Sequence, residues 1–502
     1  MVKLWSLALA LLVSAGAWAT PAMAQSSEVD KLQAELSKLR SEVDNLKAVQ
    51  RQGADDAAPA LATTLKNNVF SWATEDGKFS LTMTNRVQFR VTYNDERGQH
   101  SETLGNPADT NGRDFWNFRV VRAKTNFEGN IFEKEWKYRL QLSWASGGNN
   151  IIEYAYMTWA KYQEINVSAG QTKVPFEYEF GVSSGKQQFI DRSVVSNTFN
   201  QGWGKGLWIN GVIGKDTPWV KYWVGVFNGV LRANNDFRNQ DGAINSDTFS
   251  SGVGGVDAQL MPVLRVETHP LGNVADDEVD MRSREDSKKI LFSVGVALNW
   301  FLSDFNNSDV RPGAGPTGGS GRFNTSQDTV NLTIDGHFRF YGLSVNIEYI
   351  HRHTEFHNHG PLSGSGNANN RALPGDLTDS GLLFSVGFFI LPKQFDVGFR
   401  FGWVDSDEFW LGGSDDKRNA VAPDSTEIGL SVGYYIAGHN LKAQLDFSYI
   451  SYQLAFFGSA NGAAVNGPGG MMMPSRSANS VANDNADWLN VWQFRIQIQW
   501  IF

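Results

Sequence analysis

The sequence predicts an all-β fold, a transmembrane antiparallel β-barrel of about 16 strands, preceded by a short N-terminal coiled-coil helix. Three observations predict the barrel: the closing segment alternates apolar and polar residues, similar segments recur along the chain, and the connections between them alternate in length. From Trp492 to Phe502, apolar side chains take one face of a strand and polar side chains the other. In a membrane barrel these faces meet lipid and a wet lumen, whereas the edge strand of a soluble protein would need a core.

The composition favours one large β structure over several soluble domains. The 502 residues include 50 Gly and 17 Trp, and aromatic residues make up 13% of the chain. Tryptophan at this density suits the girdles where a membrane meets water. The sequence contains no Cys, which excludes disulfides and Cys-ligated metals. The net charge of -9 argues against nucleic acid as a partner.

Residues 1–24 predict a signal peptide. Lys3 precedes an apolar run over 4–19, and Ala22-Met23-Ala24 has the small-x-small pattern of a cleavage site. The run is too short for a spanning helix, and no other stretch approaches about 18 uninterrupted apolar residues. We therefore expect an exported protein that is soluble in the periplasm, secreted, or an outer-membrane barrel.

Residues 25–52 predict a periplasmic coiled-coil helix. Apolar residues repeat every seven positions in two series that lie three residues apart, namely Val29, Leu36 and Val43, and Leu32, Leu39 and Leu46. This a/d seam of about three heptads needs partner chains to bury its stripe. The alternative is an amphipathic helix docked on the same chain. Residues 53–72, which begin rich in Ala and Asp, predict a linker.

Residues 73–502 predict the barrel. Alternating segments begin near Phe79, Phe115, Lys134, Ile151, Ile165, Leu207, Trp219, Val256, Ile290, Thr329, Leu343, Leu382, Phe395, Thr426, Leu441 and Leu489. Short connections alternate with long polar ones, which is typical of the periplasmic and external rims of such a barrel. Two connections depart from this pattern: 147–150 is short where a long loop is due, and 268–288 is long where a turn is due.

Three stretches, in this order and spacing, resemble the phosphate-selective porin O and P family. They are NFRVVRAKTNFEGNIFEKEWKYRLQLSW (117–144), GQTKVPF (170–176) and the closing QFRIQIQWIF (493–502). The resemblance covers nearly the whole mature chain. It implies a sixteen-stranded trimeric porin of the bacterial outer membrane whose third external loop, here about 175–205, folds into the pore.

The candidate site is the charge that the strands turn toward the lumen. The side-chain alternation and the resemblance together give these pore-lining, anion-attracting candidates: Arg86, Arg90, Arg122, Lys124, Lys137, Arg139, Lys173, Arg265, Arg339, Arg400, Lys442 and Arg495. Inward acids are fewer: Glu153, Asp257, Asp335, Glu348, Asp396 and Asp446. Rings of Arg or Lys are how anion pores select. The alternative is that these cations pair with the acids and merely line a wet wall.

The first three strands carry the clearest signal, with six inward cations and almost no acid. In strand one, Val87 and Phe89 face lipid, which turns Arg86 and Arg90 inward. In strand two, Val121, Ala123 and Phe127 are expected to face lipid. Counted from the short turns, Arg90 should lie nearest the outside, Arg86 and Arg122 near mid-height, and Lys137 nearest the periplasm.

Other clusters carry weaker signals. His351, His353, His357 and His359 with Glu355, and Asp405, Asp407 and Glu408 with Asp415 and Asp416, could each hold a metal, but solvated loops are the favoured interpretation. We therefore expect no metal and no cofactor. No Ser/His pair stands out on an outward face, as a lipid hydrolase would need, so we expect no enzyme.

The predicted function is an outer-membrane porin with a water-filled, anion-selective channel for passive uptake of small solutes, phosphate among them. The alternatives are a general, sugar or organic-acid porin without phosphate preference, and an adhesive or structural barrel. The expected partners are outer-membrane lipid and lipopolysaccharide, the barrel assembly machinery through the C-terminal Phe502, two further copies in a homotrimer, and small anions as permeants.

Overall fold

The computed structural model describes residues 34–43, 61–66, 69–98, 113–145, 152–214, 219–228, 257–258, 260–304, 327–356, 376–410, 418–420, 424–453, 465–466, 472–473 and 488–502. The chain divides into two units, 1–61 and 62–502. In the first unit, residues 34–43 are helical, and Leu36, Leu39 and Val43 are exposed. The signal peptide and the rest of 25–52 lie outside the described residues, so the coiled coil stays a prediction. None of the helices in the described part has the length and apolar character of a membrane-spanning helix.

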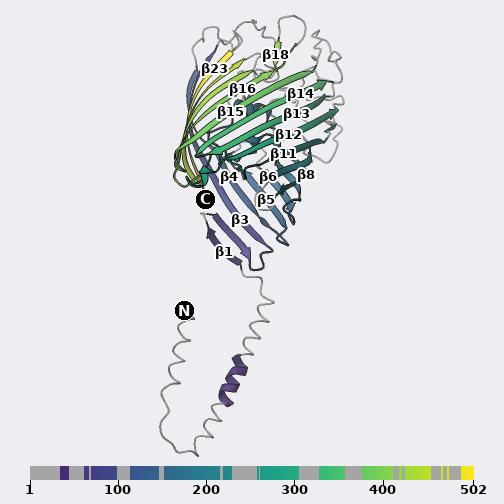
Figure 1. The fold of residues 1–502 in the computed structure, drawn as a ribbon, viewed down its shortest axis with the longest axis vertical. Helices are drawn as coiled ribbons and strands as arrows, with labels where there is room; N and C mark the ends of the chain where they lie inside the picture. The colour runs from purple at the N-terminus through teal and green to yellow at the C-terminus, as the bar shows by residue number, and fades with distance from the viewer. Residues whose placement is uncertain are drawn as a thin grey trace, which may run out of the picture. The chain divides into compact units, whose positions relative to one another are not determined.

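Sixteen strands of the second unit form a closed antiparallel barrel, as the sequence predicts (Figure 1). Each strand pairs with the next along the chain, and β23 pairs with β3 to close the ring. The strands are β3 (Ser80–Gly98), β4 (Arg113–Asn130), β5 (Trp136–Ser143), β6 (Ile152–Trp159), β7 (Asn166–Lys173), β8 (Trp203–Ile213), β9 (Val220–Phe227), β11 (Met261–Thr268), β12 (Leu291–Asp304), β13 (Gln327–Phe340), β14 (Leu343–Phe356), β15 (Leu377–Leu391), β16 (Phe395–Ser406), β19 (Ser425–Tyr435), β20 (Leu441–Gln453) and β23 (Trp488–Ile501).

Smaller strands accompany the barrel. β10 (Asp257–Ala258) pairs with the end of β12. Two short hairpins pair β17 (Glu408–Trp410) with β18 (Arg418–Ala420), and β21 (Val465–Asn466) with β22 (Met472–Met473).

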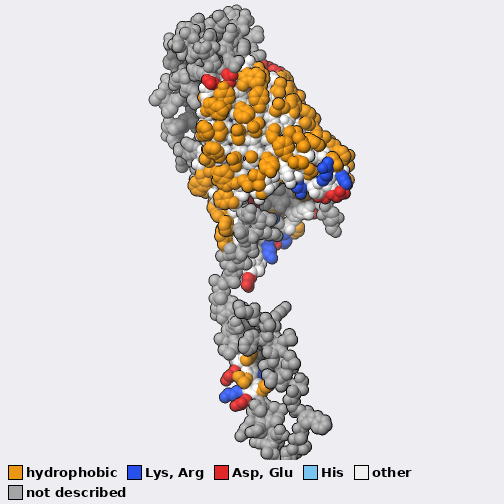
Figure 2. All heavy atoms as spheres, turned by 90° about the vertical axis from the view of Figure 1, so that its left-hand side faces the viewer, with side chains coloured by type: hydrophobic (Ala, Val, Ile, Leu, Met, Phe, Trp, Pro, Cys, Tyr) orange, Lys and Arg blue, Asp and Glu red, His pale blue; other side chains and the backbone are white. Residues whose placement is uncertain are grey.

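The strand alternation separates an apolar outer face from a polar lumen. In β23, Ile496 and Ile498 are 41% and 45% exposed, whereas Gln497 and Gln499 are 1% and 0% exposed. Figure 2 shows hydrophobic side chains gathered over the outer face of the barrel. An apolar band around a closed sheet can meet lipid because each of the sixteen strands pairs with a strand on either side.

The expected linker over 53–72 needs a correction, because part of it forms strands. β1 (Leu61–Lys66) pairs with β2 (Val69–Thr74), which pairs with the first residues of β3. The physical reason lies at the barrel seam. The C-terminal strand pairs with β3 only as far as Asn85, which bonds to Phe502, so the N-terminal end of β3 would otherwise present an open edge.

Two long connections are described in full and contact side chains inside the barrel. We call residues 174–202, between β7 and β8, the inward loop; it includes α2 (Tyr178–Gly181) and α3 (Val194–Phe199). We call residues 269–290, between β11 and β12, the rim segment; it includes η3 (Asp286–Lys288). The rim segment is the connection that is long where a short turn is due.

The main core lies between the inward loop and the barrel wall. Val195 and Phe199 of α3 are fully buried and belong to one cluster with Ile350, Leu383 and Val404 of the wall. Ser193 caps α3, and its side chain accepts a hydrogen bond from the Ser196 N–H. The inward loop is therefore packed as firmly as a domain core.

Candidate anion pathway

Charged side chains of the wall hold the backbone of the inward loop. A loop without long helices or strands must find partners for its buried N–H and C=O groups elsewhere. Wall carboxylates accept from four loop N–H groups: Glu348 from Tyr178 at 2.8 Å and from Glu179 at 3.2 Å, Asp446 from Ile190 at 3.0 Å and Glu427 from Val194 at 2.8 Å. Wall cations donate to several loop carbonyls, among them Arg265 to Phe176 at 2.7 Å, Arg400 to Asp191 at 2.8 Å, Lys442 to Gln187 at 2.8 Å and Lys173 to Val182 at 3.1 Å.

For six of the twelve predicted cations, the predicted role in attracting anions in the pore therefore needs a correction: Arg90, Arg265, Arg339, Arg400, Lys442 and Arg495. All six face the lumen, but they are buried and line neither of the two cavities described below. Ion pairs join Arg265 to Asp335, Arg400 to Glu427 and Arg495 to Asp446. Arg339 donates to the Asp277 carbonyl of the rim segment at 2.6 Å. These cations anchor inward segments, and their burial leaves them little contact with the open lumen.

The other six predicted cations line two cavities beside strands β3–β9. The first, which we call the basic cavity, has a volume of about 550 Å³ and lies between the inward loop and strands β3–β8. Two of its lining side chains are carboxylates, Glu153 and Asp276. Eight are cations: Arg86, Arg119, Arg122, Lys124, Arg139, Lys173, Lys186 and Arg192.

A β-bulge sets the composition of the basic cavity. Gln88 pairs with Arg122 but the next residue of β3 pairs with Val120, so Val121 is the extra residue. A regular strand would place side chains three positions apart on opposite faces. The bulge instead brings Arg119 and Arg122 to the same cavity, and it turns Val121 inward, where strict alternation predicts that it faces lipid.

The cations in the basic cavity differ in how far they are neutralised. Lys124 Nζ contacts both Glu153 oxygens, at 2.8 and 2.6 Å, and Arg122 Nη2 contacts Asp191 Oδ1 at 2.9 Å. Arg86 instead donates to neutral groups, the hydroxyls of two inward-loop serines, at 2.9 and 3.0 Å. The cavity therefore keeps an excess of positive charge.

Asp191 of the inward loop is the main counter-charge of this wall. Its carboxylate contacts Arg90 at 2.5 Å, Arg122 at 2.9 Å and Arg495 at 3.6 Å. Burial alone would raise the pKa of Asp191, but the three guanidinium groups together hold it well below its usual range. Asp191 is therefore ionised, and it ties the loop to β3, β4 and β23.

The sequence reasoning missed three cations of the basic cavity. Arg119 lies on the outer half of β4, where the bulge reverses which side chains face the lumen. Lys186 and Arg192 lie on the inward loop, where no alternation exists to predict direction. Arg192 donates to the carbonyls of Phe180 and Val182, both at 3.2 Å. Only the inward path of this loop, which the family resemblance implies, could have pointed to these two residues.

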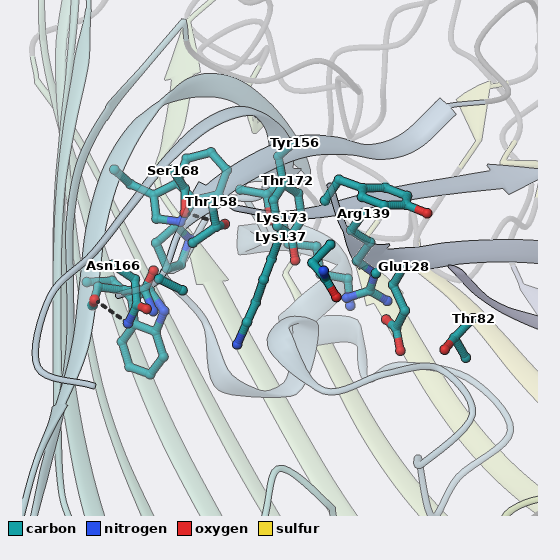
Figure 3. Close-up of a pocket in the computed structure, with 18 of the residues that line it drawn as sticks. Thr82, Glu128, Lys137, Arg139, Tyr156, Thr158, Asn166, Ser168, Thr172 and Lys173 are labelled. Atoms are coloured by element: carbon teal, nitrogen blue, oxygen red, sulfur yellow. Dashed lines mark hydrogen bonds between the residues drawn. The ribbon is translucent and has the colours of Figure 1, made fainter. Parts of the chain in front are cut away.

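The second cavity, which we call the polar cavity, has a volume of about 640 Å³ and lies nearer the short turns (Figure 3). Arg139 and Lys173 line both cavities, so the two meet at these side chains. Lys137 pairs with Asn130 beside the β4–β5 turn, Arg86 pairs with Lys124, and Arg90 pairs with Arg119. The strand register thus gives the order in height that the sequence predicts, with Lys137 nearest the short-turn rim.

The remaining candidate clusters hold no recognisable site in the described residues. His351 and His353 contact the hydroxyls of Ser380 and Thr378, and no group of three or more metal-ligating side chains occurs in this part of the chain. Asp407 accepts from the Thr378 N–H at 2.6 Å. His357, His359, Asp415 and Asp416 lie outside the described residues, and the side chains of Asp257 and Glu408 are likewise not described.

One sequence pattern associated with hydrolases occurs in the inward loop. Residues 181–185 read G-V-S-S-G, which matches the G-x-S-x-G spacing of a nucleophile elbow. Such an elbow lies between a strand and a helix, whereas this segment follows α2. The hydroxyl of Ser183 accepts a hydrogen bond from Arg86. The pattern therefore lacks the strand–turn–helix setting of a nucleophile elbow.

A comparison with protein families agrees with this architecture. The sequence model of the phosphate-selective porin O and P family matches residues 84–256 of this chain. A sequence search of curated proteins finds no match. Similar solved structures include an anion-selective porin from Comamonas acidovorans (9% identity, TM-score 0.47, covering 84% of this chain and 100% of that one). Another is the outer membrane channel DcaP of Acinetobacter baumannii (11% identity, TM-score 0.46, covering 86% of this chain and 99% of that one). A third is OmpT of Vibrio cholerae (8% identity, TM-score 0.44, covering 84% of this chain and 98% of that one). The resemblance predicted from the sequence is confirmed over residues 84–256, and with the closed 16-strand barrel it supports an outer-membrane porin channel.

Proposed function

We propose that this porin channel is anion-selective and carries small anions, phosphate among them, by passive diffusion. The observation that carries the proposal is the lining of the basic cavity, where eight cations face two carboxylates. A cleft lined by one sign of charge, with low-dielectric walls, focuses its field and concentrates ions of the opposite sign. Anions would therefore be enriched beside β3–β8.

The proposed conduction follows from the spacing of the cations along the wall. From the outer side inward, an anion would meet Arg119 and Arg122, then Arg86 and Lys124, then Arg139 and Lys173 where the two cavities meet, and finally Lys137. Conduction requires sites that attract an ion yet release it to the next site. The carboxylates beside Lys124 and Arg122 weaken individual sites and so favour release.

We further propose the assembly that the sequence and the family imply. The barrel would form a homotrimer in the bacterial outer membrane, in contact with lipopolysaccharide, after insertion by the barrel assembly machinery through Phe502. The N-terminal helix would lie in the periplasm. The channel would need no cofactor and would perform no catalysis.

The reversal potential of the purified protein in a planar bilayer, measured across a KCl gradient, tests the selectivity. We expect anion preference at 0.1 M salt or below and a marked loss of that preference in Arg86→Gln/Arg139→Gln, because both guanidinium groups line the basic cavity. Lys288→Gln/Lys289→Gln is the matched control, since it also removes two positive charges, but from exposed positions on the rim segment. A cation-selective wild-type pore, or a double variant that keeps the full preference, would contradict the proposal. A barrel that passes no current would favour an adhesive or structural role.

A further inference from the structure

The polar cavity contains chemistry that a small inorganic anion does not need. Three of its lining side chains are cations, Lys137, Arg139 and Lys173, and one is a carboxylate, Glu128. Most of the others are neutral groups that form hydrogen bonds, or aromatic rings. Chloride needs only the cations, and phosphate needs few of these neutral groups besides them. The basic cavity is lined mainly by charged groups and the polar cavity mainly by neutral polar groups. This difference indicates a permeant that has an uncharged polar part as well as a charged group.

The neutral side chains retain capacity for hydrogen bonds to a ligand. Thr158 and Ser168 share one hydrogen bond of 2.7 Å between their hydroxyls, which leaves one O–H of the pair able to donate. Asn166 donates to the Asn210 carbonyl at 3.0 Å, and the Thr172 hydroxyl also lines the cavity (Figure 3). Hydroxyl and amide groups of this kind match the hydroxyls of a polyol, which both donate and accept.

Aromatic rings form one side of the same cavity. Tyr156 and Trp208 meet edge to face with ring centroids 5.4 Å apart, and Trp223 of the neighbouring strand also lines the cavity. These rings also pack in the main core cluster, and they present an apolar wall to the cavity. Ligand sites combine apolar and aromatic walls with a few polar groups that fix orientation, and the volume of about 640 Å³ lies in the usual range of such sites.

The junction of the two cavities places charge and neutral chemistry side by side. Arg139 and Lys173 belong to both linings, so an anionic group held there would leave its attached body in the polar cavity. We propose that the polar cavity is a binding site for a hydroxylated organic anion, in which a phosphate or carboxylate group is attached to a carbon skeleton that carries hydroxyls. This inference rests on the proposed anion channel and adds the class of solute to it.

The test compares blockers of the chloride current through single pores in a planar bilayer. Glucose 6-phosphate and gluconate carry both parts of the proposed ligand, inorganic phosphate carries only the charge, and glucose carries only the hydroxyls. We expect both organic anions to block at concentrations at least about tenfold lower than inorganic phosphate, because a few additional hydrogen bonds supply such a factor. Comparing the two organic anions shows whether phosphate or carboxylate is the preferred charged group.

A double variant tests whether the binding site is the polar cavity. Thr158→Val/Thr172→Val removes two hydroxyls without changing side-chain size or charge, and it should raise the half-blocking concentration of the organic anions about fivefold or more while leaving that of inorganic phosphate within twofold. Thr92→Val is the control, because Thr92 is on β3 but lines neither cavity.

The outcomes separate this inference from the function on which it rests. An anion-selective pore that is blocked equally by inorganic and organic anions, or equally by glucose, would overturn the inference alone. A double variant that weakens block by every anion to the same extent would also overturn it. A pore that is cation-selective or passes no current would overturn the proposed function as well.

Discussion

Glu153→Gln should raise the anion preference of the channel. Glu153 is 3% exposed, and its two oxygens contact Lys124 Nζ at 2.8 and 2.6 Å. The substitution keeps the shape of the side chain but leaves the Lys124 ammonium uncompensated in the basic cavity. For an anion about 6 Å away, one added charge contributes about 0.7 kcal/mol at a dielectric constant of 80 and about 3 kcal/mol at 20. These energies correspond to roughly a threefold to hundredfold gain in local anion concentration.

The assay is the reversal potential across a KCl gradient at two mean ionic strengths. At about 0.1 M the screening length is about 10 Å, so the shift toward anion permeability should be clear, whereas at 1 M it is about 3 Å and the shift should nearly vanish. Glu153→Gln/Lys124→Gln removes both charges and should return the potential close to that of the wild type.

The single variant should also be less stable than the double variant. Breaking a buried pair from one side costs about 3–5 kcal/mol, because it leaves an unpaired charge. Heat-modifiability on gels will show whether both variants still form barrels. The reasoning fails if the folded single variant shows unchanged or reduced anion preference at low salt, or if the double variant shifts as far as the single one.

Three further predictions concern the barrel and the inward loop. Removing Trp500–Phe502 should abolish assembly in the outer membrane, because Phe502 pairs with Asn85 at the barrel seam; a truncated protein that still floats with outer membranes would refute this. Burial raises the pKa of Glu278 to about 8, so the stability of the barrel should fall as pH rises from about 4.5 to 8, and Glu278→Gln should flatten that fall in melting temperature. Gly381→Leu should displace α3, because even a Cβ there would lie 2.6 Å from the Phe199 ring; a larger conductance with weaker anion preference is expected, and unchanged conductance would contradict it.

The sign of the pH prediction follows from the neutral form of Glu278. Its ordinary pKa of 4.5 applies to the unfolded chain, so between about 4.5 and 8 the unfolded chain has released a proton that the folded barrel still holds. Folding must then take up that proton, at a cost that grows with pH and levels off above 8. Glutamine removes this term and keeps a carbonyl oxygen that can accept from the Gln188 N–H, as Glu278 does at 2.7 Å.

The fold could be predicted because a membrane barrel repeats one simple rule. Each strand alternates between lipid and lumen, so period-two segments and loop lengths sufficed for the strand count and for the direction of Arg86, Lys124 and Arg139. The rule says nothing about what the lumen contains. Whether an inward cation meets solvent or a buried loop depends on tertiary packing, which is why Arg265 and Arg400 looked like pore residues.

Local departures from the rule limited the prediction further. The bulge at Val121 reversed the parity of the outer half of β4, and no residue there signals it, since neither Gly nor Pro occurs. β1 and β2 were missed because a short edge pairing near an Ala- and Asp-rich stretch resembles a linker.

The fastening of the inward loop has a consequence for how such a channel could change its solute. Most of the wall charges that hold the loop backbone lie on β11, β14, β16 and β20, whereas the cavity cations lie on β3–β7 and on the loop itself. Substitutions on β3–β7 could therefore change which solute the channel prefers, while the strands opposite continue to hold the inward loop in place. Asp191, which forms ion pairs with Arg90 and Arg122, is the main charged link between the loop and β3 and β4. Directed evolution of permeability would best vary β4 to β6 and leave that one carboxylate untouched.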